Sequence, residues 1–209
     1  MKLNHYHKFV YISTPKVATF TIGEILKTHY SRGLEDCGLH INQIPTSCAE
    51  YFRWTICRNP YTRAVSLWWS GCRLHPPDIY GFRKGCSATD NFAQFIDWLS
   101  RTKLEDRHEL MRNQTDWLRP CQPITAIHIE SLAESIKMLP FWKQNIILPH
   151  MNTTEEKIIA QSSIEGTMIT RPHWKELYKD NNAKESVLRW ASEDFITFGY
   201  STELEDYSQ

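Results

Sequence analysis

The strongest constraint on the fold is a strand, loop and helix unit near the start of the chain. Residues 8–13 (KFVYIS) are rich in β-branched and aromatic residues and predict a buried strand that meets a turn at Thr14-Pro15. Apolar residues then recur at mostly helical spacing from Phe20 to Tyr30, before a polar stretch ends the run. The pattern therefore places the start of a helix directly after the end of a strand.

This alternation of strands and helices recurs along the chain. Residues 52–57 (FRWTIC) and 124–129 (ITAIHI) predict two more strands, and Pro60 suits the first position of a helix because its missing N–H costs nothing there. Strands that alternate with helices predict an α/β fold, with a central, mainly parallel sheet flanked by helices. Helices are expected over residues 60–70, 92–99, 132–139 and 184–198, with Gly199 ending the last, and Trp174, Leu177 and Tyr178 also lie at helical spacing.

Length and charge narrow the class of protein further. The 209 residues suit one domain over residues 1–209, with one core and no linker or repeat. The 24 basic residues balance the 24 acidic ones, which argues against nucleic acid or a membrane surface as the partner. The six cysteines form no C-x-x-C pair, and no signal peptide or membrane-spanning segment is visible. We therefore expect a soluble protein with free thiols, located in the cytoplasm.

The first loop has the properties of an anion site. Residues 14–19 (TPKVAT) lie between a strand and a helix, where backbone N–H groups and the helix dipole favour a phosphate. Lys16 adds a positive charge, and Thr19 and Thr21 add hydroxyl donors. The loop lacks the G-x-x-x-x-G-K-[ST] pattern of nucleoside-triphosphate sites, which disfavours a kinase. The alternative is a plain connection with a solvated lysine.

A second segment, residues 58–66 (RNPYTRAVS), favours an anion site over a plain connection. Together with Pro15-Lys16-Val17-Ala18-Thr19, it resembles the sulfotransferases that use 3′-phosphoadenosine-5′-phosphosulfate (PAPS), and their carbohydrate-modifying branch in particular. That family carries a P-K-V-A or P-K-x-G loop followed by Ser or Thr, and an R-N-P-x-x-R-x-x-S signature. The resemblance implies a P-loop-type domain that moves a sulfuryl group from PAPS to a hydroxyl, with a carbohydrate as the expected acceptor.

The resemblance also assigns residues to the donor. Arg58 and Ser66 are expected to hold its 3′-phosphate, and a guanidinium is a planar donor fork suited to that task. Arg63 is expected to be a surface cation on the helix instead. The family usually has a second hydroxyl residue where this chain has Phe20, so either Thr21 takes over that contact, or backbone N–H groups and Lys16 suffice. The residues expected at the 5′-phosphosulfate are Pro15, Lys16, Val17, Ala18, Thr19, Phe20 and Thr21.

Three weaker blocks extend the resemblance over nearly the whole chain. They cover residues 114–118 (QTDWL), 129–132 (IESL) and 194–200 (DFITFGY), in the order that the family has them. Each block alone is unspecific, and Glu130 or the aromatic ending can be purely architectural.

The chemistry of sulfuryl transfer suggests two catalytic residues. Negative charge develops on the oxygen that bridges to the departing phosphate, so a fixed ammonium such as Lys16 stabilises the transition state. An acceptor hydroxyl needs a base, and His40 is the first candidate because several relatives place a functional histidine in that stretch; a surface or packed histidine is the alternative. No metal is expected, since the pair His5 and His7 lies in a polar terminus expected to fray. The other candidate bases are His75, Glu35, Asp36 and Asp116.

Other features leave alternatives open. Most of the eight tryptophans are expected in the core, but the adjacent Trp68 and Trp69 point about 100° apart on one helix, so they cannot be equally buried. One of them, or a long loop over residues 74–87, is a candidate border of the acceptor cleft. The competing functions are a catalytically inactive nucleotide-binding or interaction module with the same fold and, less favoured, a small P-loop kinase.

Overall fold

The computed structural model describes residues 1–39, 41–73, 91–148 and 172–207, which form two compact units. The first unit comprises residues 1–58 and 116–153, and the second comprises residues 59–115 and 154–209. The single domain expected from the sequence stays a prediction, and each unit is described by itself below. His40 and the whole loop expected over residues 74–87, which includes His75, lie outside the described residues.

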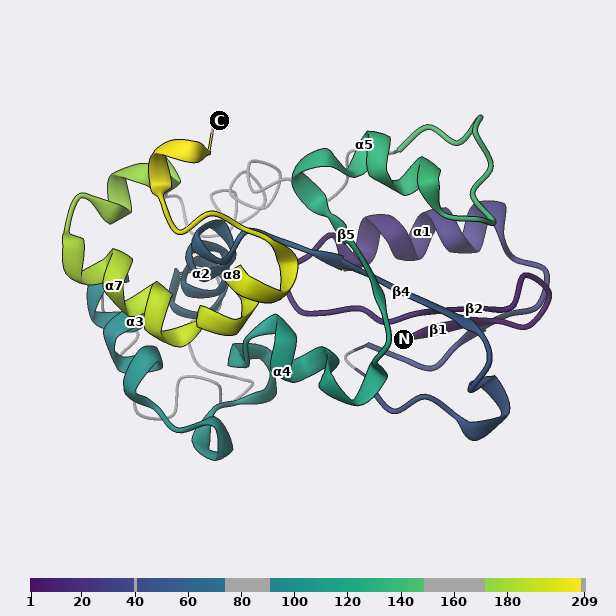
Figure 1. Ribbon diagram of the computed structural model, residues 1–209, viewed down its shortest axis with the longest axis horizontal. Coiled ribbons are helices and arrows are strands. Elements are labelled where there is room, and N and C mark those ends of the chain that lie inside the picture. Colours follow the sequence, from purple (N-terminus) through teal and green to yellow (C-terminus); the bar gives the residue numbers. More distant parts are fainter. Residues whose placement is uncertain (40, 74–90, 149–171, 208–209) are drawn as a thin grey trace, which may run out of the picture. The chain divides into compact units, whose positions relative to one another are not determined.

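The first unit is built on a five-stranded sheet with the order β3-β1-β2-β4-β5 (Figure 1). Strand β2 pairs in parallel with β4, and β4 pairs in parallel with β5. Strand β1 pairs antiparallel with both β2 and β3, so the sheet is mixed. The α/β class expected from the sequence is confirmed, and all three expected strands are the parallel ones. The strands are β1 Lys2–Asn4, β2 Phe9–Tyr11, β3 Leu34–Asp36, β4 Phe52–Cys57 and β5 Thr125–His128.

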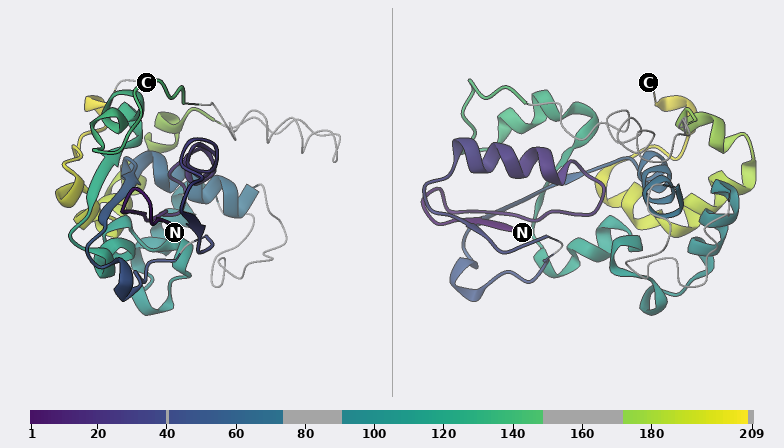
Figure 2. Two further views of the ribbon diagram at one scale, coloured as in Figure 1. Left: turned by 90° about the vertical axis from the view of Figure 1, so that its right-hand side faces the viewer. Right: turned by 180° about the vertical axis from the view of Figure 1, so that it is seen from behind.

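Two helices cover one face of this sheet. Figures 1 and 2 show α1 (Thr19–His29) lying along the strands, and α5 (Leu132–Ser135) belongs to the same layer. Ile22, Ile25 and Leu26 of α1 pack with apolar residues of β2, β4 and β5 in one buried cluster. The last four residues of β4 are buried, as expected for a strand covered on both faces. Short 3₁₀ helices in this unit are Thr46–Cys48, Arg119–Cys121, Ile129–Ser131 and Ile136–Met138.

The expectation that the polar terminus frays is wrong. Strand β1 is buried throughout because it lies between β2 and β3 in the sheet. The ammonium of Lys2 lies 2.6 Å from the Asp36 carboxylate, and the Asn4 side chain donates to the carbonyl of Tyr30 at 2.8 Å. These polar side chains can be buried in the strand because Lys2 has a partner of opposite charge and Asn4 has a hydrogen-bond acceptor.

The second unit is helical in its described residues. Helix α2 begins at Pro60 as expected, and the Asn59 side chain caps it by accepting from the Tyr61 N–H at 2.7 Å. The helices are α2 Pro60–Trp68, a π-helical turn Trp69–Arg73, α3 Phe92–Arg101, α7 Asn181–Trp190 and α8 Ser192–Phe198. Short 3₁₀ helices are Leu104–Asp106, Glu109–Met111, Trp174–Tyr178 and Leu204–Asp206, and α4 (Gln114–Leu118) crosses the boundary between the units.

Three expectations for the second unit are wrong. The helix expected over residues 184–198 is interrupted at Ala191, whose backbone leaves the helical region, so α7 and α8 are separate. Arg63 is fully buried rather than a surface cation, because its guanidinium donates to the carbonyl of Arg112 at 2.8 Å and lies 5.3 Å from the centre of the Trp190 ring. Trp68 and Trp69 are equally buried, at 4% and 3% exposure, where the helix changes from α to π geometry.

A buried carboxylate joins two segments of the second unit that are distant in the sequence. Asp194 is fully buried near the start of α8. One of its oxygens accepts from the backbone N–H of Gln114 at 2.9 Å, and the other accepts from the N–H and the hydroxyl of Thr115 at 2.7 and 2.8 Å. The blocks at 114–118 and 194–200 therefore meet through this residue and have an architectural role.

We expect Asp194→Ala to lower the free energy of unfolding by about 3 kcal/mol, because it leaves several buried donors without an acceptor. The matched control is Asp180→Ala, which removes the exposed cap of α7 and is expected to cost about 1 kcal/mol. Urea denaturation followed by circular dichroism measures both. Equal losses in the two variants would contradict the architectural role of Asp194.

Candidate anion-binding site

Parallel pairing brings two polar segments to one edge of the sheet. The loop 12–18 follows the end of β2, and Arg58 follows the end of the parallel neighbour β4. The Arg58 guanidinium donates to the carbonyl of Lys16 at 3.3 Å. The hydroxyl of Thr14 donates to the carbonyl of Ile56 at 3.1 Å, which also ties the loop to β4. Arg58, the first residue of the second signature, is therefore in contact with the first signature within the first unit.

The backbone of this loop is strained in a way that suits anion binding. Lys16 and Ala18 have φ of 69° and 56°, the left-handed region that costs a residue with a side chain about 1–2 kcal/mol. Such strain concentrates at functional sites, and left-handed residues in a turn direct successive N–H groups towards a common point. Ala18 is also the N-cap of α1 and provides no side-chain cap. The first N–H groups of α1 therefore keep their affinity for an anion.

Ser13 is a polar residue that the sequence analysis missed. Its hydroxyl is buried, with 3% of the residue exposed, and within the described part of the chain it makes no hydrogen bond. It lies within the loop 12–18, next to Thr14, so its hydroxyl is a donor suited to an anion at this edge. The signal in the sequence was a Ser-Thr pair at the end of an otherwise apolar strand.

The other residues expected at this site have distinct positions. Lys16 and Thr19 are half-buried, and the Thr19 hydroxyl donates to the carbonyl of Thr14 at 3.1 Å. The side chain of Val17 belongs to the apolar core, so only its backbone is available to a ligand. Phe20 is 58% exposed, whereas Thr21 is 9% exposed. The loop therefore offers the Lys16 ammonium and its backbone to a ligand, and an exposed aromatic ring follows it at Phe20.

Ser66 belongs to the second unit. It is half-buried on α2, eight residues after Arg58. Pro15 is buried in the loop itself. The structure thus brings Arg58 to the loop but does not test the expected role of Ser66.

The three acidic candidates for the base all have side-chain partners. Glu35 lies 3.0 Å from the imidazole of His5, Asp36 accepts from Lys2 at 2.6 Å, and Asp116 accepts from Arg119 at 2.9 Å. The hydrogen bond from Lys2 lowers the pKa of Asp36, which makes that carboxylate a weaker base. His40, the first candidate, stays a prediction.

Histidines and other potential metal ligands do not gather in the described residues. No group of three or more His, Cys, Asp or Glu side chains is placed to hold a metal ion in the described ranges. His5 is held between Glu35 and the Tyr51 hydroxyl, and His7 packs against the rings of Tyr6 and Tyr30.

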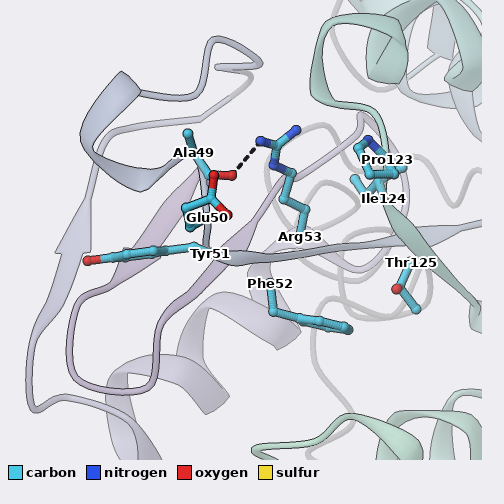
Figure 3. A pocket seen from close by; sticks show the side chains of 8 residues that line it. All are labelled: Ala49, Glu50, Tyr51, Phe52, Arg53, Pro123, Ile124 and Thr125. Carbon is cyan, nitrogen blue, oxygen red and sulfur yellow. Dashed lines mark hydrogen bonds between the residues drawn. The ribbon is translucent and has the colours of Figure 1, made fainter.

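A hollow of about 520 Å³ lies at the opposite edge of the same sheet (Figure 3). It is lined by residues at the starts of β4 and β5, including Arg53 and Thr125, whereas the loop with Lys16 follows the end of β2. The Arg53 guanidinium donates to the carbonyls of Ala49 and Gln122 at 2.7 and 2.8 Å. It therefore links the segment before β4 to the segment before β5. The loop with Lys16 therefore does not line this hollow, and the hollow is not part of the candidate anion site.

An α/β unit with a strained loop, a lysine and a partnered arginine at one sheet edge is typical of proteins that bind phosphorylated ligands. Comparison with known proteins is more specific. The model of the sulfotransferase family matches residues 1–201, nearly the whole chain. The chain therefore belongs to the sulfotransferase family, whose members transfer sulfuryl groups. The comparisons found no match among curated proteins and none among solved structures.

A search of the described residues for membrane-spanning segments found no helix with the length and apolar character needed to cross a bilayer. The cytoplasmic location expected from the sequence stays a prediction.

The left-handed backbone at Ala18 generates a test. Ala18→Gly is expected to change the free energy of unfolding by less than about 0.5 kcal/mol, because relief of strain offsets the greater freedom of the unfolded chain. Ala18→Val is expected to cost about 1–2 kcal/mol, because a β-branched residue strongly disfavours positive φ. Urea denaturation measures both, with Ala49→Val as a control at an ordinary helical φ. A stable Ala18→Val protein would contradict this loop conformation.

Proposed function

We propose that this chain transfers a sulfuryl group from PAPS to a hydroxyl acceptor, with a carbohydrate as the acceptor class. The observation that carries the proposal is the contact between Arg58 and the strained loop at Lys16. It joins the two segments that resemble the donor-binding signatures of the family. When bound, PAPS supplies the sulfuryl group, and adenosine 3′,5′-bisphosphate is the product.

The loop has the donors that the 5′ end of such a ligand requires. The sulfate and the 5′-phosphate are anions, which suit backbone N–H groups and the Lys16 ammonium. The Thr19 hydroxyl joins these donors only by giving up its hydrogen bond to the carbonyl of Thr14. The buried hydroxyl of Ser13 supports the same assignment. Because Thr21 is nearly buried on α1, we favour backbone N–H groups and Lys16, rather than the Thr21 hydroxyl, as the replacement for the family's second hydroxyl residue.

Lys16 is proposed to stabilise the departing oxygen. Its ammonium would interact more strongly with the charge that develops during in-line transfer than with the ground state. Arg58 helps to position the loop that carries Lys16, because its guanidinium donates a hydrogen bond to the Lys16 carbonyl. We further propose that Arg58 and Ser66 hold the 3′-phosphate, on the basis of the family resemblance.

His40 is proposed to take the proton of the acceptor hydroxyl. The side-chain partners of Glu35, Asp36 and Asp116 make these carboxylates less available for that task. A neutral imidazole has a pKa suited to proton transfer near neutral pH.

The donor proposal is tested by ligand binding and by the Lys16→Ala variant. Adenosine 3′,5′-bisphosphate at about 100 times its Kd should stabilise the native protein by about 2.7 kcal/mol, which raises Tm by roughly 5–10 °C. Lys16→Ala should lose about 10²–10³-fold in labelled-sulfate transfer across a panel of glycans and small alcohols. Lys103→Ala, which alters an exposed lysine of the second unit, is the control. Full activity in Lys16→Ala would overturn the mechanism, and binding without transfer by the native protein would indicate an inactive nucleotide-binding module.

The role of His40 has a separate test. His40→Ala should lower transfer by about 10²–10⁴-fold while the stabilisation by adenosine 3′,5′-bisphosphate stays the same, because a base contacts the acceptor and not the nucleotide. His173→Ala, at an exposed histidine, is the matched control. Unchanged transfer in His40→Ala would exclude this residue as the base.

A further inference from the structure

Tyr11 carries a buried hydroxyl that the packing of the first unit does not use. It is the last residue of β2 and 1% exposed, and its ring packs on Trp54 of the neighbouring strand β4, with the ring centres 4.7 Å apart. Among the residues that the structure describes, none forms a hydrogen bond of standard geometry with the Tyr11 hydroxyl. The ring therefore has a packing role that the hydroxyl does not share.

Packing alone would favour phenylalanine at this position. Burial of a hydroxyl without a hydrogen bond costs free energy, because the group loses its bonds to water and gains none in return. Phe9, two residues earlier on the same strand and in the same apolar cluster, is fully buried and has no hydroxyl. Along β2, the hydroxyl is thus found at the end next to the anion loop, which indicates a role connected with that loop.

The polar side chain near the Tyr11 hydroxyl is that of Thr19, the first residue of α1. Helix α1 covers the face of the sheet to which Tyr11 belongs, because Tyr11 and Ile22 of α1 share one buried cluster. Burial raises the pKa of Tyr11, and the nearby hydroxyl of Thr19 acts in the opposite direction. The Thr19 hydroxyl itself donates to the carbonyl of Thr14 at 3.1 Å. The two hydroxyls therefore lie close together at the start of α1.

The chemistry of Thr19 leaves room for a second hydrogen bond. A threonine hydroxyl has one hydrogen to donate and two lone pairs that accept, and the carbonyl of Thr14 uses the hydrogen in this structure. An anion at the loop competes for that hydrogen, because a charged acceptor forms the stronger bond. A donor behind Thr19 would hold the hydroxyl in its new orientation and strengthen its bond to the anion. Tyr11 offers that donor.

We propose that Tyr11 is a positioning residue of the anion site, whose hydroxyl donates to the Thr19 oxygen when the Thr19 hydroxyl turns from the Thr14 carbonyl to the anion. The inference rests on the proposed function, because the anion is the sulfate or the 5′-phosphate of the donor. Tyr11 does not contact the ligand itself, since its side chain lies in the core. Its buried hydroxyl would gain a hydrogen bond when the ligand binds.

The test compares ligand affinity with stability in Tyr11→Phe, which removes the hydroxyl and keeps the ring. Isothermal titration should show about three- to tenfold weaker binding of adenosine 3′,5′-bisphosphate, the effect of losing one neutral hydrogen bond. The Tm of the free protein should stay the same or rise, because the free protein loses no hydrogen bond. A lower Tm, or failure to fold, would assign the hydroxyl to the stability of the free protein and overturn the proposal.

Tyr30→Phe is the matched control, because Tyr30 caps the opposite end of α1 and is also 1% exposed. Its hydroxyl has partners: it donates to the carbonyl of Phe141 at 3.1 Å and accepts from the backbone N–H of Lys143 at 2.9 Å. Tyr30→Phe should therefore lower Tm and change the affinity for the bisphosphate less than twofold. Equal losses of affinity in the two variants would contradict a specific role of Tyr11.

A double-mutant cycle tests whether Tyr11 acts through Thr19. Thr19→Val removes the Thr19 hydroxyl and keeps the branched shape, and in that background Tyr11→Phe should cause no further loss of affinity. Thr19→Ser keeps a hydroxyl, so in that background Tyr11→Phe should still weaken binding by about three- to tenfold. Losses that multiply in the Tyr11→Phe/Thr19→Val protein would show that the two hydroxyls act independently, and would overturn the proposal.

Inorganic pyrophosphate separates this inference from the proposed function. If the native protein binds pyrophosphate but not the bisphosphate, the donor proposal is wrong, and the same variants titrated with pyrophosphate decide the role of Tyr11. If Tyr11→Phe binds the bisphosphate as tightly as the native protein does, the role of Tyr11 is wrong and the donor proposal stands. If the native protein binds neither anion, both proposals are wrong.

Discussion

Parallel pairing of β2 with β4 is the constraint on which the first unit depends. It brings the ends of both strands to one edge of the sheet, and with them the loop of Lys16 and the side chain of Arg58. The hydroxyl of Thr55 on β4 donates to the carbonyl of Ile12 at 2.7 Å, and that of Thr14 donates back to Ile56. These side-chain bonds continue the connection between the strands beyond the sheet ladder and hold the loop in its strained conformation.

The cost of that conformation has a functional interpretation. Lys16 and Ala18 are not glycines, so their left-handed backbone is maintained only because the surrounding contacts over-determine it. A loop that is strained in advance does not need to reorganise when an anion binds, and preorganised donors are the largest source of transition-state stabilisation in many enzymes. Membership of the sulfotransferase family gives this preorganisation a chemical purpose.

The sequence predicted the parallel part of the sheet well, for a physical reason. The strands Phe9–Tyr11, Phe52–Cys57 and Thr125–His128 lie in short runs of β-branched and aromatic residues bounded by turn residues, a pattern typical of strands. Strands β1 and β3 could not be found in this way, because each has three residues and is defined by pairing with a distant partner. Arg63 was misassigned because burial of a charge depends on the carbonyl of Arg112, 49 residues away.

In the candidate site, too, the features that depend on neighbouring residues in the sequence were predicted, and those that depend on distant contacts were not. The expected residues of the loop follow from the strand and helix patterns on either side of it, and the association of Arg58 with the loop was expected from the family resemblance. The left-handed φ at Ala18 and the buried hydroxyl of Ser13 depend on the packed structure around them, so neither was expected.

The central claim is that the chain binds a donor with two phosphate-bearing ends, one at the loop of Lys16 and the other through Arg58 and Ser66. Isothermal titration of the native protein with adenosine 3′,5′-bisphosphate, adenosine 5′-monophosphate and adenosine 3′-monophosphate tests it most directly. The account predicts that the bisphosphate binds at least about tenfold more tightly than either monophosphate, because only the bisphosphate engages both sets of donors. Equal affinities for the three nucleotides, or no binding of the bisphosphate, would contradict it.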